Sequence, residues 1–259
     1  MHTNRHLSYR GHFTGGVFGF MKQVVSKIND CRIAKVIACC DTKPYQREVD
    51  FPDYKQGRKG DKDPEMIKML VDSKRLVSDF LEVSGWETLA KKGLEADDFV
   101  AMSVDGYHDK YDKIYIMSTD SDLHQLLGYA NVFMLKKQGP YGQAAFRKEY
   151  EGIEPEDWPW LTALAGSHND VPGIRGVGEK TALKILRDCD QLEDCLAYKD
   201  GIHKDLILRN YDLSVLPYKD YRIRKSLNRR YVERDVLKFL TKYGINPPGY
   251  VIQTMRDVK

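Results

Sequence analysis

Short apolar runs of strand length alternate with helical segments over the first part of the chain. Three runs, "AKVIACC" (34–40), "KIYIM" (113–117) and "ANVFML" (130–135), have the continuous apolar character of buried strands. Apolar residues recur at helical spacing after Thr14, an expected N-cap, at about 64–83, and after Leu94. Strands that alternate with helices form mostly parallel sheets covered on both faces. The pattern therefore predicts an α/β fold with a mostly parallel central sheet flanked by helices.

Beyond about Glu154 the strand pattern stops and helices predominate. We therefore expect two domains, an α/β domain at 1–153 and a helical region at 154–259. A chain of 259 residues is long enough to bury a substantial core in such an arrangement.

The composition is that of an ordinary soluble protein, with 42% hydrophobic and 31% charged residues. No apolar run approaches the roughly 20 residues that a membrane helix requires, and the N-terminus lacks the apolar core of a signal peptide. The five cysteines are odd in number and include no C-x-x-C pair, which argues against a disulfide framework or a zinc knuckle. We expect a reduced, cytoplasmic protein with no membrane partner.

The stretch "GIRGVGEKTALKIL" (173–186) is similar to a phosphate-binding loop at the start of a helix. In a nucleotide-binding loop, four residues separate the first glycine from a Gly-Lys-Ser/Thr triplet, and a strand comes directly before. Here Glu179 separates Gly178 from Lys180, and the upstream sequence reads as a short helix from Pro155 followed by a polar loop. Both departures argue against a nucleotide-binding loop.

Basic residues concentrate between Lys219 and Lys238, where eight Lys or Arg stand against three acids, with tyrosines among them. Basic side chains mixed with aromatic ones suit a nucleic-acid backbone. A solvated helix face explains the same segment equally well.

Acidic residues gather where predicted strands end and where a predicted helix begins. In open α/β sheets, ligands bind beyond the carboxyl ends of the strands. Carboxylates crowded at that edge require cations, and oxygen-only ligation selects Mg²⁺ or Mn²⁺ over zinc. Two such ions promote in-line phosphoryl displacement, so the pattern favours phosphodiester hydrolysis. The acids concerned are Asp41, Glu95, Asp97, Asp98, Asp120 and Asp122.

Each acidic group alone also has a structural explanation. Acids at helix N-termini cap unpaired N–H groups and complement the helix dipole. The metal-site interpretation therefore depends on the three groups meeting in the fold.

Four blocks resemble, in order, the signature blocks of the 5′-nuclease family. They are "CCDTKPYQREVDFPDYKQGR", "GLEADDFVA", "STDSDLHQLL" and "VPGIRGVGEKTALKIL". This family includes flap endonucleases, phage 5′–3′ exonucleases and the 5′-nuclease domain of bacterial DNA polymerase I. The resemblance covers about residues 14–186 and implies a PIN-like α/β nuclease domain followed by a helix–three-turn–helix DNA-binding motif.

By this resemblance, the six acids above hold metal ions or metal-bound waters, and Asp170 is a further ligand. Lys55 and Arg58 match the basic pair that steers the scissile phosphate. The segment at about 55–75 would form an arch near the active site. The expected cofactors are one or two Mg²⁺ or Mn²⁺ ions, and the expected partner is DNA with 5′ ends or 5′ single-strand/duplex junctions, bound by a monomer.

The resemblance also assigns the glycine-rich stretch to a hairpin that binds the phosphates of duplex DNA. Gly176 and Gly178 allow close approach of backbone N–H groups, while Lys180 and Thr181 add side-chain contacts. Carbonyl groups of the hairpin would hold a monovalent cation such as K⁺. The residues expected there are Leu164, Ala165, Pro172, Ile174 and Val177.

The chain departs from the family pattern in two places. The family opens with a strand ending in a metal-binding Asp, whereas "MHTNRHLSYRGHFTGG" resembles the segment that follows that strand. In "AGSHNDVPG", where relatives carry two aspartates, Asp170 is the only acid. The leading hypothesis is a metal-dependent 5′ nuclease that leaves a 5′-phosphate. One alternative is a DNA-junction-binding homologue with impaired catalysis, and another is a ribonuclease of the related α/β type.

Overall fold

The computed structural model describes residues 7–55, 63–167, 171–189, 191–220 and 230–258. Arg58 and Asp170, both expected in the site, lie outside these residues. The chain divides into two compact units. The terminal unit comprises Met1–Cys39, Gly60–Leu89 and Lys225–Lys259, and the central unit comprises Cys40–Lys59 and Ala90–Arg224. These units divide the chain differently from the expected boundary at 153/154, because the last helices pack with α1 (Gly15–Cys31) and α3 (Pro64–Ser84).

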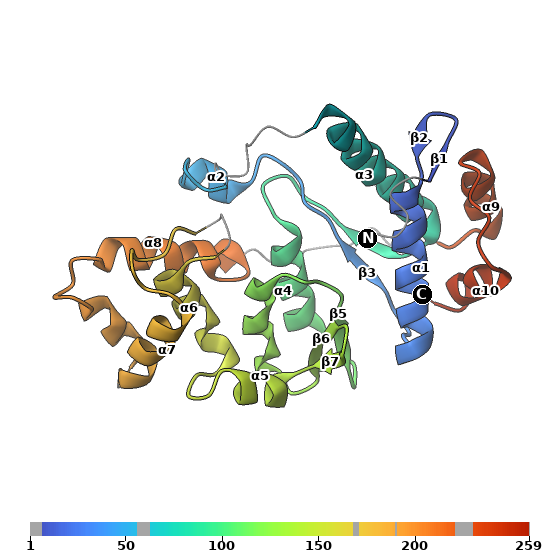
Figure 1. Cartoon of the computed structure of the whole chain (residues 1–259). Coiled ribbons are helices and arrows are strands. Elements are labelled where there is room, and N and C mark those ends of the chain that lie inside the picture. Colours follow the sequence, from blue (N-terminus) through green and yellow to red (C-terminus); the bar gives the residue numbers. More distant parts are fainter. Residues whose placement is uncertain (1–6, 56–62, 168–170, 190, 221–229, 259) are drawn as a thin grey trace. The chain divides into compact units, whose positions relative to one another are not determined.

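Four helices, a short hairpin and a parallel strand pair form the terminal unit (Figure 1). Helix α1 packs against α3 and α10, and α3 also packs against α9. Gly16 allows close approach of α1 to α3, since a Cβ there would lie 2.4 Å from the Ser73 hydroxyl oxygen. The elements are β1 (Ser8–Tyr9), β2 (His12–Phe13), α1 (Gly15–Cys31), β3 (Ile37–Cys39), α3 (Pro64–Ser84), β4 (Glu87–Leu89), α9 (Glu233–Lys242) and α10 (Gly249–Asp257).

Helix α1 follows the predicted apolar spacing. It buries Val17, Met21 and Val24 on one face, and Thr14 is its N-cap residue, as expected. The Thr14 side chain makes no cap hydrogen bond and donates instead to the Leu7 carbonyl at 3.5 Å.

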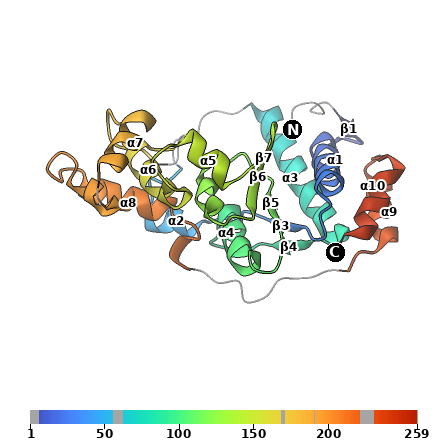
Figure 2. The same ribbon diagram turned by 90° about the horizontal axis from the view of Figure 1, so that it is seen from below.

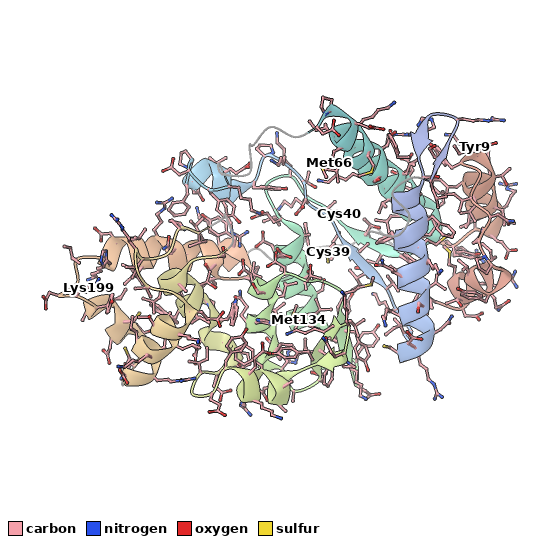
Figure 3. All side chains as sticks on the ribbon, viewed as in Figure 1. Tyr9, Cys39, Cys40, Met66, Met134 and Lys199 are labelled. Atoms are coloured by element: carbon pink, nitrogen blue, oxygen red, sulfur yellow. The ribbon has the colours of Figure 1, made fainter. Side chains whose placement is uncertain are left out.

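The loop between α9 and α10 packs on the β1–β2 hairpin through a glycine. Gly244 has a φ of +60°, and a Cβ there would lie 2.5 Å from the ring of Tyr9. Figure 3 shows Tyr9 on the hairpin. A glycine is required because the backbone is left-handed and the aromatic ring occupies the side-chain space.

The central unit contains a small three-stranded sheet, a set of helices and several 3-10 turns (Figure 2). Strand β5 pairs with β6 in parallel, and β6 pairs with β7 in antiparallel orientation. The elements are α2 (Gln46–Asp50), α4 (Ala96–Tyr107), β5 (Ile114–Ile116), η2 (Ser121–Gly128), β6 (Val132–Lys136), β7 (Gly139–Tyr141), α5 (Gln143–Glu149), η3 (Pro155–Asp157), α6 (Trp158–Ala165), α7 (Glu179–Asp188), η4 (Leu192–Ala197), α8 (Lys204–Ser214) and η5 (Tyr218–Asp220).

The core of the central unit lies between β6, η2 and the helices. Val132 and Met134 of β6 are buried, as is Leu123 of η2, and they share a cluster with Phe146 and Leu164. Met134 is labelled in Figure 3.

The three predicted strands are present in shortened form as β3, β5 and β6, and the α/β class is confirmed. The expectation of one mostly parallel sheet is not met among the described residues, which form separate sheets β3–β4 and β5–β6–β7 besides the hairpin. Strand β7 was not predicted because it contains Gly139 and Pro140, two residue types that are depleted from strands. No helix in the described ranges is long and apolar enough to cross a membrane.

Candidate active site

Acidic side chains from three segments of the central unit gather around Asp97. Burial, and after it the charges of the neighbouring carboxylates, together raise the pKa of Asp97 to about 7. Nearby negative charges add to the effect of burial, and the carboxylates that contribute here identify the charged neighbours of Asp97. The structure therefore brings together five of the seven predicted acids: Asp97, Asp120, Glu95, Asp122 and Asp41.

Two of these acids also cap backbone groups. Asp41 accepts a hydrogen bond from the Ala96 N–H at 2.8 Å, at the start of α4. Asp120 is the N-cap of η2 and accepts from the Asp122 N–H at 3.0 Å. The structural and functional explanations thus apply together, because capping fixes where each carboxylate lies.

Two acids at the start of α4 are buried and fully engaged by protein groups. Glu95 accepts hydrogen bonds from Arg47 at 3.0 Å and from the Tyr54 hydroxyl at 3.2 Å, and its other oxygen pairs with Lys55. Asp98 accepts from Arg47 at 2.9 Å and from the Glu95 N–H at 3.0 Å. Its second oxygen accepts from the Tyr218 N–H at 2.9 Å.

Asp98 therefore has a structural role in this geometry, and its predicted role as a metal ligand stays a prediction. The side chain is 1% exposed, and both of its oxygens already accept hydrogen bonds from protein donors. A metal ion would have to displace at least one of these donors to reach it.

The remaining carboxylates fit a hard divalent cation by their chemistry. Within the described ranges, no group of three or more acidic, histidine or cysteine side chains lies close enough together to hold a metal ion. Carboxylates influence one another's pKa over longer distances than those of metal ligation, so the two findings agree. The neighbouring carboxylates contribute to the raised pKa of Asp97. A bound Mg²⁺ or Mn²⁺ would reduce the repulsion between these oxygen donors.

The Cys40 thiol adjoins this cluster but is a poor ligand. Burial raises the pKa of Cys40, and the charge of Asp41 raises it further. A thiol held in its neutral form competes weakly for metal. Figure 3 labels Cys40, and none of the five cysteines, all of which lie in the described ranges, forms a disulfide.

Lys55 lies at the carboxylate cluster, as the family resemblance implied. Its backbone has a left-handed φ of +58°, and its ammonium group lies 5.3 Å from the ring centre of Tyr45 and 4.9 Å from that of Tyr54. The ion pair with Glu95 places this cation beside the acids.

The predicted hairpin joins α6 to α7, and its glycines have distinct roles. Gly173 has a φ of +62°, and a Cβ there would lie 2.6 Å from the backbone of Ala165, so the residue is fixed by close packing. Gly176 and Gly178 have open space where a Cβ would stand. These two glycines and the following Lys180 and Thr181 are exposed, as residues that contact a backbone phosphate must be.

Hydrogen bonds inside the hairpin use some of the carbonyl groups predicted to bind a monovalent cation. The Ile174 N–H donates to the Leu164 carbonyl at 2.8 Å, and the Val177 N–H donates to the Ile174 carbonyl at 2.9 Å. Each carbonyl oxygen has a second lone pair. The cation site at Leu164, Ala165, Pro172, Ile174 and Val177 stays a prediction.

Three residues of the site escaped the sequence-based prediction. Arg47, Tyr54 and Tyr218 all contact the acids at the start of α4 or adjoin them. Arg47 and Tyr54 both lie within the block "CCDTKPYQREVDFPDYKQGR", but nothing in a single sequence distinguishes a buried arginine from an exposed one.

Known proteins similar to this chain agree with the geometry. The family described as "5'-3' exonuclease, N-terminal resolvase-like domain" matches residues 2–151. The chain is 30% identical over 233 residues to a 5'-3' exonuclease of Aquifex aeolicus, covering 88% of this chain and 78% of that protein. It is also 30% identical over 195 residues to the thermostable DNA polymerase I of Thermus thermophilus, of which the match spans 23%.

Solved structures share the fold at low sequence identity. The D15 flap endonuclease of bacteriophage T5, in a complex with DNA and metal ions, superimposes with a TM-score of 0.68 at 18% identity, covering 97% of this chain and 91% of that chain. Flap endonuclease-1 from Methanococcus jannaschii has a TM-score of 0.56 at 13% identity, covering 98% and 86%. The solved structures show the shared fold, and the family match over residues 2–151 with the Aquifex aeolicus relative establishes that the chain belongs to the 5′–3′ exonuclease family.

Proposed function

We propose that this protein is a structure-specific 5′ nuclease, a 5′–3′ exonuclease and flap endonuclease that hydrolyses DNA phosphodiesters with divalent metal. The observation that carries the proposal is the gathering of carboxylates around Asp97, with Lys55 beside them. The exposed glycine hairpin belongs to the same compact unit as this cluster.

The residues that would hold Mg²⁺ or Mn²⁺ are Asp41, Asp97, Asp120 and Asp122, with Glu95 at their margin and Asp170 as a further candidate. When bound, the cation supplies electrostatic stabilisation for the charge that develops on the phosphodiester. Lys55 adds a positive charge that orients the scissile phosphate, and Arg58 is proposed for the same task. The product carries a 5′-phosphate.

The segment from α6 to α7 would act as a helix–three-turn–helix motif that binds the duplex beside the cleavage site. Backbone N–H groups at Gly176 and Gly178 approach the phosphates, and the N-terminus of α7 favours negative charge. Lys180 and Thr181 add contacts that carry no sequence preference. The same proposal includes K⁺ bound at the hairpin carbonyls and an arch at about 55–75. It also includes action as a monomer and a cytoplasmic location.

A 5′-labelled flap duplex provides the direct test. The protein is incubated with it in Mg²⁺, in Mn²⁺ and in EDTA, and product sizes are read on a denaturing gel. The proposal expects metal-dependent products at or near the junction. A flap that is bound in a gel shift but never cut would instead identify a DNA-junction-binding homologue, and preferential cleavage of the matching RNA flap would identify a ribonuclease.

A further inference from the structure

Arg47 is buried between two segments that are far apart in the sequence. The side chain is 3% exposed, although a guanidinium group is strongly hydrated in water. Its Nη1 donates to Glu95 and Asp98, at 3.0 and 2.9 Å. On the other side, Nε donates to the Leu213 carbonyl at 3.1 Å and Nη2 to the Val215 carbonyl at 3.2 Å.

These bonds connect α2 to the start of α4 and to the end of α8. Leu213 and Val215 lie at the C-terminus of α8, where carbonyl groups lack partners within the helix. A planar guanidinium group can serve two carboxylates and two carbonyls at once because its five N–H groups point in fixed directions. The guanidinium carbon also lies 4.6 Å from the ring centre of Tyr218.

A second set of contacts holds α2 in the same place. The Tyr218 hydroxyl donates to Asp50 at 2.7 Å, and Lys219 pairs with the same carboxylate at 2.5 Å. The backbone N–H of Tyr218 in turn donates to Asp98. The short helix α2 is therefore fixed on both sides, by Arg47 and by Asp50.

We propose that Arg47 is a positioning residue of the nuclease site, one that never touches DNA or metal. It holds the Glu95 carboxylate and the first turn of α4 against the end of α8. This contact also fixes the position of Asp97, which lies in that first turn. This inference rests on the proposed nuclease function and deepens it by dividing the acids into two sets. Glu95 and Asp98 belong to the framework that Arg47 organises, while Asp41, Asp97, Asp120 and Asp122 remain for the cation.

Replacing Arg47 should affect cation binding and the rate of cleavage in opposite directions, and this difference gives the test. Removing a positive charge beside crowded carboxylates strengthens cation binding by simple electrostatics. Loosening the first turn of α4 slows the reaction, since a misplacement of about 1 Å costs roughly a hundredfold in rate. A positioning residue therefore separates metal binding from turnover when it is replaced.

The experiment uses two variants. Arg47→Lys keeps the positive charge but loses the planar guanidinium group, and Arg47→Gln loses both. Cation binding is measured without DNA, from the rise in Tm during titration with Mn²⁺. Turnover is measured on the 5′-flap duplex at saturating Mg²⁺. Arg147→Gln is the matched control, because Arg147 forms an exposed pair with Glu154 at 2.7 Å in the same unit.

We expect both Arg47 variants to lower kcat by about tenfold to a hundredfold with KM for DNA unchanged. Arg47→Gln should bind Mn²⁺ at least as tightly as the unaltered protein, and Arg147→Gln should match it in every respect. Should Arg47→Gln fail to fold, Arg47→Gln/Asp98→Asn removes both charges of the buried Arg47–Asp98 pair, leaves Glu95 paired with Lys55, and should regain Tm while kcat stays low.

Two outcomes would overturn the inference. A fall in Tm with normal kcat would make Arg47 a stability residue only. A raised KM, with a salt dependence of DNA binding that falls by about one unit, would make it a phosphate contact. If the unaltered protein binds Mn²⁺ but cuts no flap, the nuclease proposal fails, and the division of the acids is then judged on Mn²⁺ binding alone: weaker binding by Arg47→Gln would contradict it.

Discussion

The carboxylate cluster and the glycine hairpin belong to one compact unit but are built on opposite principles. The cluster gathers like charges in a partly buried place, so each acid depends on donors and caps contributed by distant segments. The hairpin exposes uncharged backbone, and its shape depends on glycine conformations within a few residues. The arrangement of the carboxylates thus depends on the tertiary fold, whereas the shape of the hairpin proposed to bind phosphate depends on local sequence.

The largest expected effect comes from breaking the cluster alone. Asp120→Asn keeps the cap on the Asp122 N–H but removes one negative charge. We expect cleavage of the flap duplex to fall at least roughly a hundredfold, with duplex binding through the hairpin retained. Cleavage assays and gel shifts on the same preparation measure both, and Asp112→Asn, on an exposed position, is the control. Normal turnover in Asp120→Asn would remove the metal-site assignment.

Acid should destabilise the central unit through His124, which lies on the same 3-10 helix as Asp122. This residue of η2 lies 4.5 Å from the ring of Trp158, and burial, followed by the charge of Lys136, lowers its pKa to about 4. An unfolded histidine titrates near pH 6.5, so the unfolded chain takes up this proton first as the pH falls. Stability is therefore complete above about pH 6.5 and is lost between there and pH 4, on the order of 3 kcal/mol at most.

The measurement is urea unfolding at pH 7, 5.5 and 4 for the unaltered protein and for His124→Phe. Other carboxylates titrate in both proteins, so the difference between the two curves reports on position 124. We expect the variant to lose less stability between pH 6.5 and 4. Parallel curves would show that His124 takes no part.

Breaking the hairpin alone calls for a glycine substitution. Gly173→Ala places a Cβ 2.6 Å from the Ala165 backbone in a left-handed conformation, so we expect a loss of about 1–3 kcal/mol in stability and weaker duplex binding. Gly178→Ala meets open space at a negative φ of −93° and should leave Tm nearly unchanged. Equal Tm values for the two variants would contradict the packing role of Gly173.

The smallest expected effect concerns a single side chain of the hairpin. Lys180→Ala should weaken duplex binding equally for all sequences and reduce the salt slope by about one, because one phosphate contact is lost. Fluorescence anisotropy at several salt concentrations measures this, with Lys148→Ala on α5 for comparison. A loss confined to certain sequences would mean that Lys180 reads bases.

The features that the sequence predicts well are those written in contiguous residues. Apolar runs predict the three strands and the long helices α1 and α3. The ends of two of these runs mark Asp41 and the acids at Asp120. The expectation that those acids gather was based on carboxyl ends of strands sharing one sheet edge. The acids do gather around Asp97, although β3 and β5 belong to separate sheets among the described residues.

What escaped prediction depends on contacts between distant residues. The helices α9 and α10 pack with α3 and α1, and the loss of strand pattern beyond Glu154 does not reveal that contact. The burial of Arg47 depends on carbonyls 166 and 168 positions later, and no local pattern announces it. The same contacts hold Asp98, which gives it a structural role in this geometry.

The hydrogen bonds between Arg47 and the end of α8 have a consequence for the synthesis of the protein on the ribosome. The start of α4 cannot take its final place until residues 213–218 have been synthesised and have left the exit tunnel. At 5–20 residues per second, roughly 10 to 30 s pass between the synthesis of Arg47 and that of Leu213. In the later part of that interval, once Asp122 has been made, the nascent chain carries nearly every acid of the proposed site but lacks the residues that align them. We therefore expect it to be inactive until residues 213–218 have emerged.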